Sequence, residues 1–249
     1  MERTVSAIVL KRADRGEADR RLTLLTPDMG KLEVIARGAK KPQSRLAAGS
    51  EPLSVGEYGI AATRKTWFVT GVRPVSVYKR LRTDYWRLHA ALSITEICAA
   101  CVPFGADAAP EWHLLNACLA GIESADDPFP AYAWALAQWL QITGFAPNLD
   151  PLYVLQRDGH RIVLLSPGLG TSVHPETQPW PIDVIEASWE CGVALARLPL
   201  LEAPPAKMQG CSDVVRVLVQ FVRAHAESEL PVTQALVSEW TTHVSKLQG

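Results

Sequence analysis

The sequence contains few cysteines and no long hydrophobic run. There is no stretch of 18 or more apolar residues, and Met1–Lys11 alternates in polarity where a signal peptide would be uniformly apolar. An odd number of cysteines in a mid-sized chain without an export signal predicts free thiols. The cysteines are Cys98, Cys101, Cys118, Cys191 and Cys211. We therefore expect a soluble, cytoplasmic protein.

The motifs of common enzyme classes are also missing. There is no Gly-x-x-x-x-Gly-Lys-(Ser/Thr) loop for nucleotide phosphates, no Gly-x-Ser-x-Gly elbow and no His-Glu-x-x-His helix. Cys98-x-x-Cys101 has no second cysteine pair with which to hold zinc. We predict that the protein is not an enzyme and has no catalytic residue, metal or cofactor. A hydrolase or metalloenzyme is the least favoured alternative.

What the sequence does contain is a strong separation of charge. The net charge is −1, yet up to Arg87 there are 18 Lys and Arg against 9 Asp and Glu. After Arg87 there are 7 Lys and Arg against 17 Asp and Glu. Such asymmetry indicates that the first part meets a polyanion. The alternative is a solvated basic face without a partner.

The first 77 residues have the pattern of a small β-barrel. Short segments rich in β-branched residues are separated by turn signals such as Pro27-Asp28-Met29-Gly30. The predicted strands are Thr4–Lys11, Arg21–Thr26, Lys31–Arg37, Leu53–Ala62 and Trp67–Val77. A five-stranded OB-fold is the natural candidate, and an SH3-like barrel remains open on this pattern alone.

Residues 78–249 have the pattern of a mostly α-helical domain. Apolar residues recur at three- and four-residue steps from Tyr85 to Val102, and Asp158-Gly159 indicates a hairpin within an irregular insertion near 144–181. Further helices are predicted over Pro110–Ile122, Pro130–Thr143, Ile182–Arg197, Cys211–Ala226 and Pro231–Lys246. The expected fold class is α+β multidomain, with an OB-fold barrel (1–77) followed by a helical domain (78–249).

The best candidate binding residues lie along the third predicted strand and the loop after it. Alternation places Leu32, Val34 and Ala36 on one face of the strand and Lys31 and Arg37 on the other. The loop adds Lys40, Lys41 and Arg45. Together these five cations predict contacts with the phosphates of nucleic acid.

Aromatic residues near this cluster could stack on bases. Single-stranded nucleic acid is bound by a cationic groove with flat side chains in it. Tyr58, Trp67 and Phe68 are the candidates, beside Arg64 and Lys65. Alternation requires either Trp67 or Phe68 to point inward, and we favour Trp67 over Phe68 as the stacking residue. The predicted DNA-binding set is Lys31, Arg37, Lys40, Lys41, Arg45, Arg64, Lys65 and Trp67.

These same residues carry a resemblance to a known family. Leu22–Lys31 (LTLLTPDMGK) and Ala36–Leu46 (ARGAKKPQSRL) resemble the RecO signature, a strand ending in Thr-Pro, then Gly-Lys-Leu, then Ala-Arg-Gly with a basic-Pro-x-Ser loop. Weaker matches occur at Leu81–Asp84 and Gly144–Leu149. The resemblance is specific in the first ~50 residues and extends over the whole chain only in layout.

The resemblance implies a non-enzymatic, nucleoid-associated recombination mediator in DNA repair. RecO-like proteins bind single- and double-stranded DNA, anneal complementary strands and, with RecR, help load RecA onto DNA covered by single-strand-binding protein. The resemblance also implies a site on the helical domain for the acidic tail of single-strand-binding protein. The cations that could serve there are Arg197, Lys207, Arg216 and Arg223. Ordinary helix-surface charge is the alternative interpretation for each.

One departure from the family concerns zinc. Many members carry a four-cysteine module after the Gly-(aromatic)-x-Pro-x-Leu stretch, whereas Asp150–His174 contains no cysteine here, and His160 and His174 provide only two ligands. We therefore expect a zinc-less hairpin. A different class of function also stays open, an adaptor whose basic barrel binds an acidic protein partner.

Overall fold

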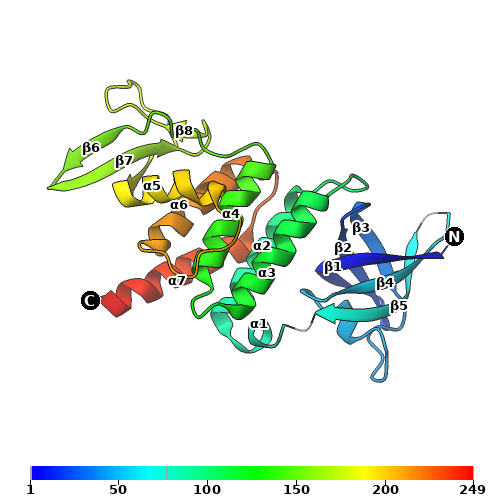
Figure 1. Ribbon diagram of the computed structural model, residues 1–249. Coiled ribbons are helices and arrows are strands. Elements are labelled where there is room, and N and C mark those ends of the chain that lie inside the picture. Colours follow the sequence, from blue (N-terminus) through cyan, green and yellow to red (C-terminus); the bar gives the residue numbers. More distant parts are fainter. Residues whose placement is uncertain (1, 65, 77, 249) are drawn as a thin grey trace. The chain divides into compact units, whose positions relative to one another are not determined.

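The computed structural model describes residues 2–64, 66–76 and 78–248, with the side chains of 247 and 248 left out (Figure 1). Two compact units divide the chain, Met1–Asn116 and Ala117–Gly249. The division expected near residue 77 stays a prediction, and Lys65, one of the predicted DNA-binding residues, lies outside the described residues.

The first unit begins with a closed five-stranded barrel. The strands are β1 (Glu2–Arg15), β2 (Asp19–Thr26), β3 (Gly30–Ala36), β4 (Val55–Ala62) and β5 (Trp67–Ser76). They follow the order β1-β2-β3-β5-β4, with β4 pairing back to β1 and β3 running parallel to β5. This is the OB-fold order, so the fold predicted for the N-terminal part is confirmed.

Alternate side chains of β2 and β3 point into the barrel core. Leu22, Leu24, Leu32 and Val34 are all at most 7% exposed and belong to one cluster of buried side chains. Burying each such side chain contributes about 1.5–3 kcal/mol relative to leaving it exposed. Because the side chains of a strand alternate between its two faces, the residues between these four face outward.

Helices follow the barrel, and the third of them begins in the first unit and ends in the second. A short α1 (Lys79–Thr83) precedes α2 (Tyr85–Cys101), and α3 (Ala109–Ser124) begins after a loop. The Asp84 side chain accepts a hydrogen bond from the Arg87 N–H and caps α2. As predicted, α2 ends just before Pro103.

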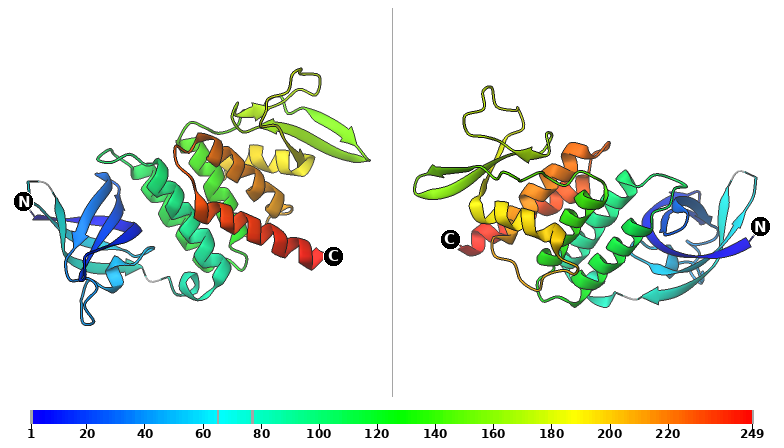
Figure 2. Two further views of the ribbon diagram at one scale, coloured as in Figure 1. Left: turned by 180° about the vertical axis from the view of Figure 1, so that it is seen from behind. Right: turned by 45° about the horizontal axis from the view of Figure 1, so that its top comes forward.

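The second unit is built on α4 (Phe129–Ile142), α6 (Cys211–His225) and α7 (Pro231–Gln248), which Figure 2 shows from two further sides. Apolar residues of α4 fill its centre, and α6 contacts both α4 and α7. The rings of Phe129 and Trp240 stack with centroids 3.4 Å apart. Trp134 and Trp139 are also buried, as expected for helix-packing residues.

A small sheet forms the insertion. It contains β6 (Val154–Arg157), β7 (His160–Ser166), β8 (Thr171–Ser172) and β9 (Ile185–Ser188). Asp158 and Gly159 both have positive φ, as the predicted hairpin turn requires. The helix predicted over Ile182–Arg197 is wrong in its first half. Ile185–Ser188 pairs with β7 instead, and α5 (Trp189–Arg197), followed by the short η2 (Leu198–Leu200), begins only after Ser188 caps it.

None of the five cysteines forms a disulfide, and four of them are buried. None of the described helices is long and apolar enough to cross a membrane.

Candidate nucleic-acid interface

A groove runs over the outer side of β1, β2, β3 and the start of β5. We call it the outer groove. It has a volume of about 500 Å3 and is lined by Asp14, Arg15, Arg21, Glu33, Val34, Ile35, Thr66 and Trp67. In OB-folds the β2–β3 face and the β1–β2 and β4–β5 connections form the usual surface for oligonucleotides. The outer groove occupies that surface.

Strand register explains how this surface is assembled. Leu22 and Val34 are opposite one another and point into the core, so Arg21 and Ile35, one residue before and after them, point outward. Ile35 lies opposite Arg21 on one side and Phe68 on the other. The outer face therefore combines a cation, an aliphatic side chain and an aromatic ring in one row.

Two arginines lie over aromatic rings on the barrel. The guanidinium of Arg37 lies 4.1 Å from the centroid of Phe68, and that of Arg3 lies 5.2 Å from the centroid of Trp67. Trp67 packs partly against the barrel core, whereas Phe68 shares the outward face of Ile35. Phe68 is therefore the better placed of the two for stacking, in contrast to our preference for Trp67, although Trp67 also lines the outer groove.

Tyr58, the third aromatic candidate, is inaccessible. Its ring is fully buried, and its hydroxyl donates a hydrogen bond to the Gly49 carbonyl at 2.7 Å. Burial raises the pKa of the Tyr58 hydroxyl well above its usual value. Tyr58 is therefore a core residue and is not available to a base.

The basic loop after β3 is held against the β1–β2 turn. The Gly38 N–H donates to the Asp19 carboxylate at 2.8 Å, and the Lys40 N–H donates to the Ala18 carbonyl at 2.9 Å. Gly38 has a φ of +66°, which other residues rarely adopt. Within the described residues, the exposed side chains of Arg37, Lys41 and Arg45 form no ion pair.

Lys40 is partly neutralised by the protein itself. Its ammonium lies 2.7 Å from the carboxylate of Asp14. The hydrogen bond from Lys40 is the main cause that lowers the pKa of Asp14 below its usual value. Lys40 therefore has a competing anion next to the outer groove, which Arg37 and Lys41 do not have among the described residues.

Lys31 lies apart from the exposed cations. It is only 7% exposed, and its ammonium donates to the Ala99 carbonyl of α2 at 2.7 Å and lies 4.4 Å from the Phe104 ring centroid. The Lys31 N–H also donates to the Pro103 carbonyl. Burial lowers the pKa of Lys31. Alternation placed this side chain outward, but the loop after α2 covers it, so Lys31 is not part of the exposed surface.

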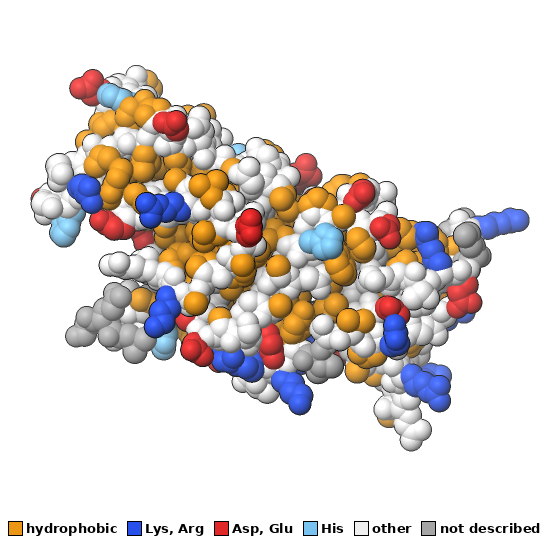
Figure 3. Space-filling view, viewed as in Figure 1, with side chains coloured by type: hydrophobic (Ala, Val, Ile, Leu, Met, Phe, Trp, Pro, Cys, Tyr) orange, Lys and Arg blue, Asp and Glu red, His pale blue; other side chains and the backbone are white. Residues whose placement is uncertain are grey.

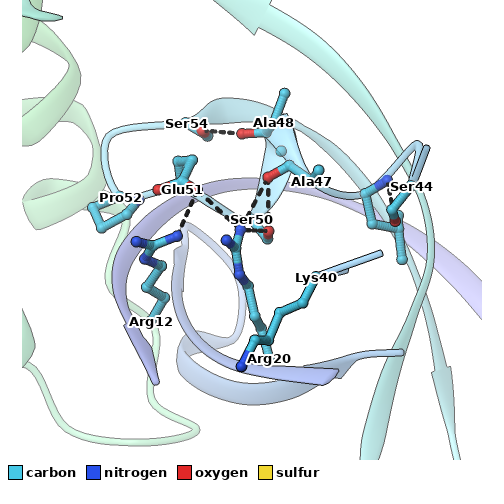
Figure 4. Close-up of polar contacts among 12 residues, drawn as sticks. Arg12, Arg20, Lys40, Ser44, Ala47, Ala48, Ser50, Glu51, Pro52 and Ser54 are labelled. Atoms are coloured by element: carbon cyan, nitrogen blue, oxygen red, sulfur yellow. Dashed lines mark hydrogen bonds and ion pairs between the residues drawn. The ribbon is translucent and has the colours of Figure 1, made fainter. Parts of the chain in front are cut away.

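A second set of arginines is used inside the barrel unit (Figure 4). Arg20 donates to the Ser50 hydroxyl at 2.6 Å and to Glu51 at 2.9 Å, and Arg12 also pairs with Glu51. We call these residues the Arg20 network. It ties β1 and β2 to η1 (Ala48–Ser50). Figure 3 shows that Lys and Arg side chains lie close to Asp and Glu side chains on one face of the barrel.

Sequence reasoning missed Arg15 and Arg21. Both are exposed, line the outer groove and form no ion pair within the described part of the chain. The signal was present, because Arg21 precedes the inward-facing Leu22 in a strand. Arg64 is exposed in the β4–β5 connection, where Thr63 and Thr66 close the turn through backbone hydrogen bonding.

The second unit brings together two of the four predicted partner-binding cations. Arg197 and Lys207 line a groove of about 470 Å3 with Trp189, Leu198 and Leu201, among others. We call it the helical-unit groove. A third cation, Arg161, joins them there and lies 5.1 Å from the Trp189 ring centroid. Arg161 pairs with Glu190, which also lines the groove, whereas Arg197 and Lys207 form no ion pair within the described residues.

The other two predicted anchors lie elsewhere. Arg216 pairs with Asp213 and donates to the Glu186 carbonyl. Arg223 lines a separate cavity of about 440 Å3 with Ile182 and Asp183. Among the described residues, no group of three or more His, Cys, Asp and Glu side chains is arranged to hold a metal ion.

Comparison with known proteins gives consistent matches. The family model "Recombination protein O N terminal" matches residues 1–78. The chain is 40% identical over 116 residues to the DNA repair protein RecO of Heliobacterium modesticaldum, covering 44% of this chain and 42% of that protein. It is 33% identical over 171 residues to the DNA repair protein RecO of Moorella thermoacetica, covering 68% and 64%. The matched segments thus span about half the length of these relatives.

Proposed function

Because the chain belongs to the RecO family, we propose that it acts in DNA repair and recombination by binding DNA without covalent chemistry. Its ligands would be single- and double-stranded DNA, and its activity would be to anneal complementary strands. The outer groove and the neighbouring basic loop form the proposed DNA surface. The cations assigned to phosphate are Arg15, Arg21, Arg37, Lys41, Arg45 and Arg64, with Lys40 in a secondary role.

The observation that carries this proposal is the combination of free cations with an outward aromatic ring on the ligand face of an OB-fold. Arg15 and Arg21 line the outer groove, and the guanidinium of Arg37 lies over the ring of Phe68. A cationic groove follows the backbone of a single strand, and aromatic rings stack on its bases irrespective of sequence. Arg21 and Phe68 lie on either side of Ile35 in one row across β2, β3 and β5.

The same charges support annealing. Two DNA strands repel one another through their phosphates, and a protein that neutralises some of these lowers the repulsion and releases counterions. Complementary bases could then form base pairs while both strands are bound at the barrel. No proton transfer or bond cleavage is needed.

The test is the salt dependence of binding, measured by fluorescence anisotropy with a mixed-sequence single strand. If about four cations engage phosphates, log K should fall with log salt with a slope of about −3. Mixing two complementary strands with the protein should also speed their annealing. A slope near zero, or only feeble affinity at physiological salt, would instead favour an adaptor that binds an acidic protein partner.

The helical-unit groove supports a second contact, with the acidic tail of single-strand-binding protein. An acidic peptide with apolar side chains needs cations next to an apolar wall, which Arg197 and Lys207 provide beside Trp189. We expect Arg197→Ala with Lys207→Ala to lower affinity for a tail peptide about tenfold or more. Arg223→Ala, a cation in another cavity, is the control and should leave affinity unchanged.

Family membership also leads us to propose RecR as a direct partner and RecA as an indirect one. The expected outcome is that this protein and RecR together shorten the lag of RecA filament formation on single strands covered by single-strand-binding protein. Each protein added alone should be less effective. The double variant of the helical-unit groove should reduce this effect while leaving annealing of bare strands intact.

A further inference from the structure

The outer groove contains carboxylates as well as cations. Asp14 and Glu33 both line it, together with Arg15 and Arg21. A groove that bound only phosphates would gain nothing from negative charge, because a carboxylate near a phosphate repels it. The two carboxylates therefore need separate explanations.

Asp14 is already engaged. Its carboxylate accepts a hydrogen bond from Lys40 at 2.7 Å. Glu33 differs, because among the described residues its exposed side chain forms no hydrogen bond or ion pair. It lies opposite Thr23 on the outward face of β3, two residues before Ile35. Glu33 thus presents a free acceptor on the ligand face.

The chemistry of a carboxylate decides what it can meet there. An ionised carboxylate only accepts hydrogen bonds. Phosphate has no donor to offer, whereas the exocyclic amino groups of cytosine, adenine and guanine do. Thymine offers one N–H between two carbonyl oxygens, which repel a carboxylate. A single strand could therefore turn its bases toward Glu33 while Arg15 and Arg21 hold its backbone.

We propose that Glu33 is a specificity-determining residue of the outer groove, which accepts hydrogen bonds from base amino groups and favours single strands rich in cytosine over strands of thymine. The inference rests on the proposed DNA-binding function.

The experiment compares oligo(dC) with oligo(dT) of equal length, binding to the full chain at fixed pH and salt by anisotropy. The unmodified protein should prefer oligo(dC) by about five- to tenfold. Glu33→Gln should tighten binding of oligo(dT) more than that of oligo(dC), because an amide can also donate to thymine oxygens. The preference should then fall to about one- to twofold.

Glu17→Gln is the matched control. Glu17 is exposed in the β1–β2 turn and does not line the outer groove. Its loss changes the net charge by the same amount, so both affinities should rise equally and the preference should persist. Glu33→Asp retains the charge but withdraws the carboxylate, and should reduce the preference without tightening oligo(dT). Thermal melting of each variant checks that it is folded.

The possible outcomes distinguish a failure of the Glu33 inference from a failure of the proposed DNA binding. If Glu33→Gln raises both affinities in the same proportion as Glu17→Gln, Glu33 acts only through its charge and the inference is wrong. A lack of preference in the unmodified protein would also overturn it, while leaving DNA binding intact. If neither oligonucleotide binds, the proposed function itself fails.

Discussion

The outer groove and the Arg20 network use the same residue types in the same barrel for different purposes. Arg15 and Arg21 are exposed and have no acidic partner among the described residues, whereas Arg12 and Arg20 are held by Glu51 and Ser50. A count of positive charge treats all four alike. Only the second pair has internal partners, so only the first pair is available to a polyanion.

The largest effect should follow from emptying the outer groove of positive charge. Replacing Arg15, Arg21 and Arg37 together by Ala removes about three phosphate contacts, so the salt slope should change from about −3 to about −1. Affinity for a single strand near 0.15 M salt should fall on the order of a hundredfold, or about 2.7 kcal/mol. Strand annealing should be lost, as measured by a fluorescence pairing assay.

A control for this variant carries the same change in net charge. Arg73, Arg157 and Arg223 are replaced by Ala, and Arg73 and Arg157 already have the acidic partners Glu57 and Glu186. The salt slope should stay near its original value. Equal loss of affinity in both triple variants would mean that overall charge, and not the outer groove, governs binding.

The opposite result is expected for the Arg20 network. Arg20→Met removes hydrogen bonds to Ser50, Glu51 and the Ala47 carbonyl, and hydrogen bonds to charged groups contribute about 1.5–3 kcal/mol. The free energy of unfolding should fall by about that amount, measured by denaturant titration. Affinity of the folded protein for DNA should change less than about twofold. A large loss of affinity at unchanged stability would show that Arg20 binds DNA directly.

A smaller effect is expected from the aromatic side of the outer face. Phe68→Ala removes one stacking surface, worth about 1–3 kcal/mol per base, and should weaken single-strand binding by about five- to tenfold without changing the salt slope. Tyr85→Ala, an exposed aromatic outside the barrel, serves as the control. Affinity retained in Phe68→Ala but lost in Trp67→Ala would restore Trp67 as the stacking residue.

The smallest effect should come from freeing Lys40. Asp14→Asn removes its competing anion and should tighten single-strand binding by about two- to threefold. The lowered pKa of Asp14 means that the pair is complete above the usual value of 3.8 and is lost only as pH falls through the lowered value. Between pH 8 and pH 5 the contribution of Lys40 to binding should therefore stay constant. A change in Lys40-dependent affinity within that range would contradict this.

Much of the site could be predicted from local pattern. Alternation along β3 correctly predicted Leu32, Val34 and Ala36 as core, and the Pro-Asp-Met-Gly turn formed where expected, with Gly30 at a φ of +57°. A side chain added to Gly30 would lie 2.0 Å from the Ala106 carbonyl oxygen. Glycine is thus required here for a second reason, the close approach of Ala106. Because Ala106 is 76 positions away in the sequence, no local pattern reveals this approach.

The errors have a common origin in contacts distant along the chain. Lys31 has the sequence position of an exposed cation, but the loop after α2 buries it. Ile185–Ser188 has an amphipathic pattern compatible with a helix, yet it forms a strand because its backbone pairs with β7. In both cases a partner far away in sequence supplied hydrogen bonds that outweighed the local preference.

By itself the sequence determined where charge accumulates, which residues form the barrel core and that the strands are short enough to close a small barrel. These properties depend on side-chain chemistry and on neighbours one to four residues apart. Tertiary structure alone decided which cations stay free. An ion pair such as Lys40–Asp14 or Arg20–Glu51 joins residues 26 or 31 positions apart, and it forms only when strand register brings their side chains within a few ångströms.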